Sequence, residues 1–235
     1  MSPTQLPETR IRVAILDDHQ SALDSYALRL AGNPNITVVG AANYGNELGT
    51  LLESGPIDVL VLDVGVPNSA EDRSPYPILH LLPRMRKAYP RMATLVISMH
   101  DQHTLVKAIL DAGASGYILK EDREAIIQLA EVVTLINTGG IYLSQRLGSL
   151  LGNSAKGDIQ LLNPREQEVL SLAAAYPDLT TVALAERMSI APSTVRNLLS
   201  KAYKRLHVRS RSAAIDKARR LGLIAPYISD PTLKD

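Results

Sequence analysis

Three carboxylates, one hydroxyl and one ammonium group follow short apolar runs in the first half of the chain. They belong to Asp17, Asp18, Asp63, Ser98 and Lys120. Clustered carboxylates repel one another unless a cation lies between them, and Mg²⁺ binds such oxygen ligands while leaving room for phosphate oxygens. An aspartate can accept a phosphoryl group covalently, and hydroxyl and lysine donors can stabilise the phosphate. These residue types therefore suit phosphoryl transfer to an aspartate with the help of Mg²⁺.

These side chains can meet only if the apolar runs before them are strands of one sheet. The runs are residues 11–16, 36–41, 58–63, 94–98 and 116–119, all short and rich in Val and Ile, as strands covered on both faces are. Between them, apolar residues three or four apart predict helices around 23–30, 78–85, 105–110 and 126–136. Five β/α units predict a parallel sheet wound on both sides by helices, with functional groups at the carboxyl ends of its strands.

Each of these side chains also has an ordinary structural explanation. A pair of acids after a strand is more often part of a turn or a helix cap. A lone lysine at such a position is usually a solvated surface group, and Ser98 could cap a helix. The functional interpretation depends on all five residues lying at strand ends within one series of β/α units.

The first half resembles the receiver domain of bacterial response regulators over residues 10–137. The resemblance is carried by Leu16-Asp17-Asp18-His19, Asp63-Val64-Gly65-Val66-Pro67, Ser98 and Gly116-Tyr117-Ile118-Leu119-Lys120. It implies a flavodoxin-like (βα)5 fold of strand order 2-1-3-4-5. It also implies that Asp63 accepts a phosphoryl group from a histidine kinase or a phosphotransfer protein.

The resemblance assigns a role to each residue of the expected phosphorylation site. Asp18, Asp63 and the backbone of Gly65 would hold Mg²⁺, with Asp17 assisting. Ser98, Tyr117 and Lys120 would bind the phosphoryl group or change position in response to it.

Two features depart from the usual receiver pattern. A longer, polar, proline-bearing segment at 68–77 replaces a compact turn with glycine, and Met99 stands where a small residue usually follows the Ser or Thr. The bulk of Met99 could hinder phosphoryl access or slow hydrolysis. Both features are similar to the RcsB (Rcs phosphorelay) branch of these regulators, and the polar tail at 229–235 is loosely similar too. They also leave open a second hypothesis, a phosphorylation-independent receiver used for protein interaction or heterodimerisation.

Basic residues are in excess in the second half of the chain. Up to residue 136 acids outnumber bases by five, whereas beyond it bases outnumber acids by six. This asymmetry indicates two units with different partners, one of them plausibly a polyanion, although a solvated basic surface explains the charge alone equally well. Residues 138–160 are expected to form a linker with a short helix around 146–151. Helical patterns follow at 164–174, 181–188, 192–206 and 212–221, and Asn163 offers a cap for the first of them.

The predicted helix at 192–206 follows a helix and a short turn, which is the pattern of a helix-turn-helix. Its apolar residues share one face, and Arg and Asn on the other suit the major groove, where Arg reads guanine and Asn reads adenine. Residues 161–225 resemble the NarL/FixJ (LuxR-type) DNA-binding domain, through 162–170, Ala185, 193–197, Leu206 and Val208. The resemblance implies base contacts from Arg196, Asn197 and Ser200, and phosphate contacts from Thr194, Lys201, Lys204 and Arg205.

The composition argues against several other classes of protein. The chain has no cysteine, which removes disulfides and thiol chemistry and fits a reducing compartment. We find no secretory signal in residues 1–12 and no apolar run that could cross a bilayer, so we expect a soluble, cytoplasmic protein. An α/β phosphohydrolase or a flavin protein would need a second catalytic carboxylate or a cofactor loop. The sequence therefore predicts a non-enzymatic regulator, at most a weak autophosphatase, that binds promoter DNA as a homodimer or with another regulator.

Overall fold

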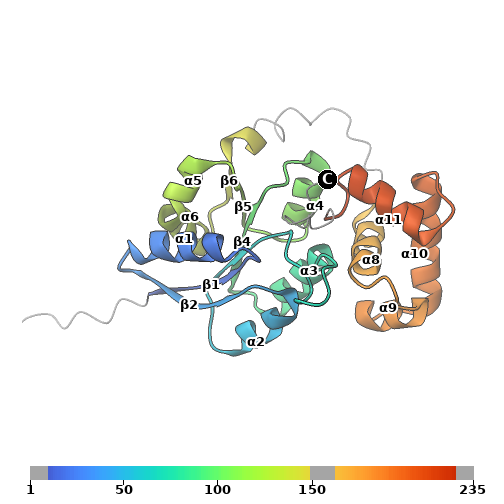
Figure 1. Cartoon of the computed structure of the whole chain (residues 1–235), viewed down its shortest axis with the longest axis horizontal. Coiled ribbons are helices and arrows are strands. Elements are labelled where there is room, and N and C mark those ends of the chain that lie inside the picture. Colours follow the sequence, from blue (N-terminus) through green and yellow to red (C-terminus); the bar gives the residue numbers. More distant parts are fainter. Residues whose placement is uncertain (1–9, 149–161, 226–235) are drawn as a thin grey trace, which may run out of the picture.

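The computed structural model describes residues 10–148 and 162–225 of the chain (Figure 1). Its strands are β1 (Ile11–Leu16), β2 (Ile36–Ala42), β3 (Val59–Leu62), β4 (Ala93–Ser98), β5 (Gly116–Leu119) and β6 (Tyr142–Leu143). The helices around them are α1 (Gln20–Ala31), α2 (Leu48–Glu53), α3 (Ile78–Ala88), α4 (His103–Asp111), α5 (Arg123–Ile127) and α6 (Leu129–Asn137), with a 3-10 turn η1 (Gly45–Glu47) before α2. The second domain contains α8 (Pro164–Ala175), α9 (Thr181–Met188), α10 (Pro192–Arg205) and α11 (Arg211–Arg220).

The strands form one parallel sheet in the order β2-β1-β3-β4-β5-β6. The order of the first five strands confirms the predicted flavodoxin-like arrangement. The sixth strand was not predicted, because Tyr142 and Leu143 lie in the segment expected to be a linker. They pair with β5 through Gly116 and Tyr117, and the backbone N–H of Ser144 donates to the carbonyl of Tyr117 at 3.0 Å. The sheet therefore extends into the expected linker, and the part of that segment from 149 to 160 lies outside the described residues.

Alternate residues of each central strand enter two separate cores. Val13 and Ile15 of β1 face α1, α5 and α6, whereas Ala14 and Leu16 face the side of α2, α3 and α4. All four are fully buried, as expected of a strand covered on both faces. The helical pattern expected around 126–136 is divided into α5 and α6 at Gln128, where ψ is 23°.

The C-terminal part is the predicted four-helix unit. Asn163 caps α8, since its side chain accepts from the backbone N–H of Glu166 while the Glu166 carboxylate accepts from that of Asn163. Ser189 ends α9 in the left-handed conformation, with φ 55°, and turns the chain into α10. No helix among the described residues is long and apolar enough to cross a membrane.

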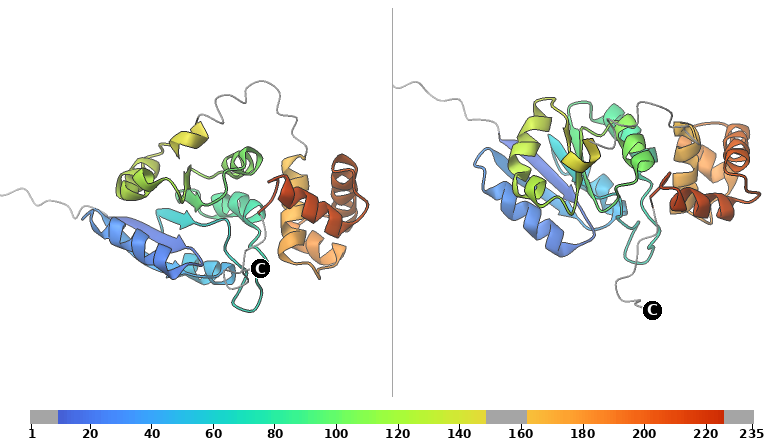
Figure 2. Two further views of the ribbon diagram at one scale, coloured as in Figure 1. Left: turned by 45° about the horizontal axis from the view of Figure 1, so that its top comes forward. Right: turned by 90° about the horizontal axis from the view of Figure 1, so that it is seen from above.

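Helix α8 joins the two domains. Its residues from 166 to 175 are all buried, because one side packs on α9, α10 and α11 and another lies against α3 of the first domain (Figure 2). The domains are therefore in direct contact through this helix.

Candidate functional site

An ion-paired cluster lies at the carboxyl ends of β1, β3 and β5. Asp17 follows β1 and Asp63 follows the neighbouring β3, and both are almost fully buried, with exposed fractions of 1% and 8%. The ammonium group of Lys120 lies 2.7 Å from Oδ2 of Asp17 and 2.8 Å from Oδ2 of Asp63. Sheet order brings these three residues, which come from distant parts of the sequence, to one edge, and the long side chain of Lys120 reaches across β4 to both carboxylates.

Asp18 and His19 complete the cluster on its exposed side. One ligand atom from each of Asp17, Asp18, His19 and Asp63 lies within 4.8 Å of the others, and Nδ1 of His19 is 2.8 Å from Asp18 Oδ1. Three carboxylates opposite one ammonium leave an excess of two negative charges. A compact group of carboxylate oxygens with an excess negative charge is a donor set that fits a hard divalent cation.

The charges of the cluster perturb its own titration. Burial raises the pKa of Asp17, and the charge of Asp63 adds to this effect, so that the opposing influence of Lys120 is outweighed. Burial works to lower the pKa of Lys120, but Asp63 and Asp17 outweigh it and the pKa is raised. Lys120 is therefore protonated, whereas the ionised form of Asp17 is destabilised by burial and by the charge of Asp63.

Backbone hydrogen bonds fix the orientation of the carboxylates. The N–H of Gly65 donates to Oδ1 of Asp63 at 3.1 Å, and the N–H of His19 donates to Oδ1 of Asp17 at 3.0 Å. The backbone of Gly65 is therefore in direct contact with Asp63.

Ser98 and Tyr117 lie in the neighbouring strands and are fully buried. The backbone N–H of Lys120 donates to the carbonyl of Ser98 at 2.9 Å, which aligns the ends of β4 and β5. Tyr117 points inward and its hydroxyl donates to the carbonyl of His100 at 2.7 Å. Burial raises the pKa of this hydroxyl, so it remains a donor, and it ties β5 to the loop between β4 and α4.

Helix α10 presents a polar face to solvent. The residues that the sequence suggested for DNA contact are all exposed, namely Thr194, Arg196, Asn197, Ser200, Lys201, Lys204 and Arg205. Val195, Leu199 and Ala202 on the opposite face are buried against the domain core. Arg205 also lies 3.2 Å from the fully buried carboxylate of Glu166, so this side chain has a structural partner as well.

Sequence reasoning missed a buried hydrogen-bonded contact between the domains. Nδ1 of His80 on α3 is 2.8 Å from Oε1 of Glu168 on α8, and both side chains are largely buried. Arg84, one turn after His80, donates to the backbone carbonyl of Arg187. No local sequence pattern pairs these residues. The signal that the sequence offered is His80 itself, a polar residue among the apolar residues of the predicted helix at 78–85.

The loops that leave the acidic cluster also reach the second domain. Asn68, in the unusual segment after β3, donates from Nδ2 to the carbonyl of Ala175 at the end of α8, at 2.8 Å. Gly222 has φ +62° and lies so close to Gln102, in the loop after β4, that an added Cβ would be 2.5 Å from its Cβ. Both loops at the cluster are therefore in contact with the DNA-binding unit.

Comparison with known families supports both domains. Residues 13–131 match the response regulator receiver domain, and residues 160–218 match the LuxR family of bacterial regulatory proteins. The transcriptional regulatory protein UhpA of Salmonella typhimurium is 31% identical over 81% of this chain and 91% of its own. The transcriptional regulatory protein DegU of Brevibacillus brevis is 27% identical over 90% of this chain and 94% of its own.

Solved structures share the two-domain fold. RcsB from Salmonella enterica serovar Typhimurium bound to promoter P1flhDC has a TM-score of 0.61 and 20% identity, over 88% of this chain and 98% of that one. The same protein bound to promoter rprA has a TM-score of 0.59 and 22% identity, again over 88% of this chain and 98% of that one. At these identities the likeness shows the fold, and membership of the RcsB branch stays a prediction. From the two matched domains and the relatives of the whole chain, the protein belongs to the two-component response regulators that act as transcription factors through a LuxR-type DNA-binding domain.

Proposed function

We propose that Asp63 is the residue that accepts the phosphoryl group. The observation that carries this proposal is the buried triad of Asp17, Asp63 and Lys120, which combines a nucleophilic carboxylate with a fixed ammonium group. An oxygen of Asp63 forms a bond to phosphorus while the bond between phosphorus and the imidazole nitrogen of the donor breaks. Lys120 is positioned to neutralise the negative charge that then accumulates.

A magnesium ion fits the cluster as the second source of positive charge. Asp17, Asp18, Asp63 and the backbone of Gly65 are the residues that would hold it, and it would offset charge on the transferring phosphoryl group. Ser98 and Tyr117 are the residues that would then respond, since one ends β4 and the other holds the loop after β4. Because this loop contacts Gly222 of the DNA-binding domain, a change in it can alter how the domains dock.

The DNA-binding function belongs to α10. We place Arg196, Asn197 and Ser200 at base edges in the major groove, and Thr194, Lys201, Lys204 and Arg205 at phosphates. A dimer would present two such helices to successive major grooves of promoter DNA, and RcsB dimers bound to DNA share this fold. The domains would be the receiver at 10–137, to whose sheet β6 adds a strand, a connection over the rest of 138–160, the DNA-binding domain at 161–225 and a tail at 226–235.

Substitutions on α10 should separate base reading from phosphate binding. Arg196→Ala is expected to weaken binding to the preferred sequence by about 1–3 kcal/mol and to reduce discrimination between sequences. Lys204→Ala should weaken binding to all sequences alike and reduce the slope of log affinity against log salt concentration by about one. Titration of specific and scrambled duplexes at several salt concentrations measures both quantities. An equal loss on every sequence for Arg196→Ala would contradict its role at the bases.

The effect of phosphorylation on DNA affinity tests the proposed function as a whole. We expect affinity for the preferred duplex to change when the protein is incubated with a small phosphodonor and Mg²⁺. If affinity is unchanged although Asp63 is phosphorylated, the receiver is a phosphorylation-independent interaction module. Met99, which is 65% exposed beside Ser98, and the segment at 68–77 are the features that motivate this alternative.

A further inference from the structure

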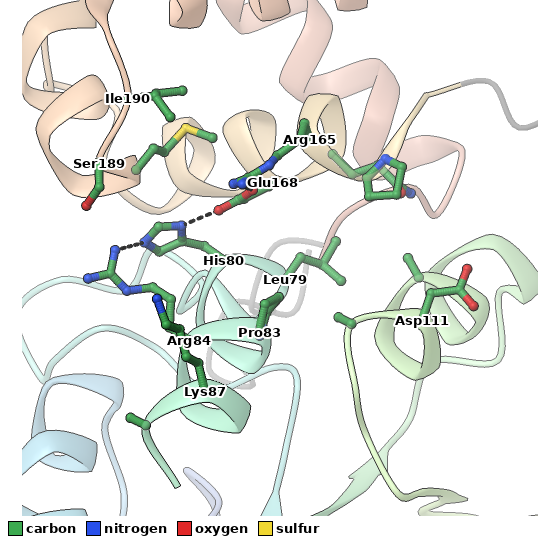
Figure 3. A pocket seen from close by; sticks show the side chains of 16 residues that line it. Leu79, His80, Pro83, Arg84, Lys87, Asp111, Arg165, Glu168, Ser189 and Ile190 are labelled. Carbon is green, nitrogen blue, oxygen red and sulfur yellow. Dashed lines mark hydrogen bonds and ion pairs between the residues drawn. The ribbon is translucent and has the colours of Figure 1, made fainter. Parts of the chain in front are cut away.

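A pocket of about 940 Å³ lies between the two domains (Figure 3). Its walls come from α3 and α4 of the receiver and from α8 and the turn after α9 in the DNA-binding domain. Packed protein interiors leave few voids larger than a water molecule, whereas small-molecule sites measure about 300–1,000 Å³ and are frequent at domain interfaces. Small or rigid side chains keep the space open, namely Pro83, Ala88, Ala108, Ala112 and Pro164.

On one side of the pocket, the negative charge of Glu168 is balanced by Arg165. The carboxylate of Glu168 is 2.8 Å from Nδ1 of His80 and 2.8 Å from Nη1 of Arg165. Burial works to raise the pKa of Glu168, but the hydrogen bonds from His80 and Arg165 outweigh it and leave the pKa lowered. This carboxylate is therefore ionised and already satisfied, so it does not call for a cationic ligand.

Beside this group, α3 carries two positive charges without acidic partners. Arg84 and Lys87 are three residues apart on α3 and so lie on one face of the helix, and both line the pocket. Arg84 contacts only neutral acceptors, the carbonyl of Arg187 and, at 3.4 Å, Nε2 of His80. Across residues 10–148 and 162–225, no carboxylate lies within ion-pair distance of either side chain. Asp111, on the far rim, is paired with Lys107 at 2.8 Å.

Apolar side chains surround the remaining space. Leu79 of α3 and Ala108 of α4 face Met188 and Ile190 from the end of α9 and the turn that follows. An apolar lining with a few polar or charged groups is typical of sites for small organic molecules.

We propose that this pocket binds a small organic anion, whose acidic group lies at Arg84 and Lys87 and whose apolar body lies between the domains. A carboxylate, sulfonate or phosphate ester on an aromatic or aliphatic body has this chemistry. The site is separate from the acidic cluster and adds a ligand input to phosphorylation. Because the ligand touches both domains, it binds the docked arrangement more tightly than a separated one and stabilises it.

Anilinonaphthalene sulfonate is a probe with this chemistry, since it joins a sulfonate to an apolar ring system and fluoresces in apolar surroundings. We expect saturable binding to the full-length, unphosphorylated protein. Lys87→Gln should weaken this binding about tenfold, the effect of losing one charged hydrogen bond. Ala108→Leu, which places a larger side chain in the apolar part of the pocket, should also weaken it. Lys87 is exposed, so its replacement leaves the fold intact.

Two controls make the test specific. Arg86→Gln removes the same kind of charge from α3 but does not line the pocket, and it should leave the affinity unchanged. The uncharged probe phenylnaphthylamine should bind wild type and Lys87→Gln equally and bind Ala108→Leu more weakly. If the sulfonate binds all variants with wild-type affinity, or if Arg86→Gln weakens it as much as Lys87→Gln, the pocket is a packing gap and the proposal is wrong. Phosphate labelling of Asp63 takes no part in this measurement, so its outcome is independent of the proposed function.

Discussion

Asp63→Asn is expected to lose all phosphoryl uptake from a small phosphodonor while the protein keeps its fold. An amide cannot form the acyl phosphate that a carboxylate forms, but its single oxygen can still accept the hydrogen bond from Gly65, and Lys120 keeps its ion pair with Asp17. We expect the phosphorylated fraction, measured by intact mass spectrometry in the presence of Mg²⁺, to fall to background. The change in DNA affinity that the phosphodonor causes in wild type should disappear with it.

Asp24→Asn is the matched control for this experiment. Asp24 is exposed on α1, where it accepts a hydrogen bond from Gln20 at 2.9 Å, and it takes no part in the acidic cluster. The same change of chemistry at this position should leave phosphorylation at the wild-type level. If Asp63→Asn is labelled as well as wild type, another side chain accepts the phosphoryl group, and peptide mapping should test Asp17 and Asp18 first.

The acidic cluster was accessible to sequence reasoning because its geometry follows from strand order. Asp17, Asp63 and Lys120 each stand directly after a strand, and parallel strands bring their carboxyl ends to one edge. Five apolar runs sufficed to predict this edge, since buried strands have a pattern that is visible in the sequence.

Elements that depend on tertiary packing were harder to predict. Helix α2 has only six residues and includes Gly49, so its pattern is too short to stand out, and we predicted no helix there. Strand β6 consists of two residues that are ordered by pairing with β5, which no local signal reveals. Short elements of this kind are decided by tertiary context rather than by propensity.

Contacts between the domains were also beyond the sequence. His80 and Glu168 are 88 residues apart, and their pairing depends on how two independently patterned units dock. The polar residues Gln167, Glu168 and Ser171 of α8 predict an exposed helix face, whereas the structure buries all three. The sequence shows that the segment at 68–77 departs from the receiver pattern. Its contact with Ala175 is seen only in the structure.

Lys120→Met is expected to lower the free energy of unfolding by about 3 kcal/mol in the absence of divalent cations, because removal of one partner from a buried ion pair leaves its charge uncompensated. Methionine retains most of the apolar volume, so the loss reports the ammonium group. Asp17 and Asp63 would then be buried with no cation near them. Denaturant unfolding of wild type and variant with a chelator present measures the difference. Added Mg²⁺ should stabilise the variant more than wild type, since the ammonium no longer competes for the same carboxylates.

The dependence on pH identifies the carboxylate responsible. Burial and Asp63 raise the pKa of Asp17 above its ordinary value of 3.8, so the folded state retains a proton that the unfolded state releases, and this group contributes less stability as the pH rises through that range. Without Lys120 the pKa of Asp17 should be raised further, because Lys120 is the group that lowers it. The stability lost in Lys120→Met should therefore be smaller at about pH 4 than at about pH 7. Lys120→Met combined with Asp17→Asn should recover most of the stability at neutral pH, because the amide removes one of the two repelling charges. If the single and double variants unfold alike at both pH values, repulsion between Asp17 and Asp63 is not what Lys120 relieves.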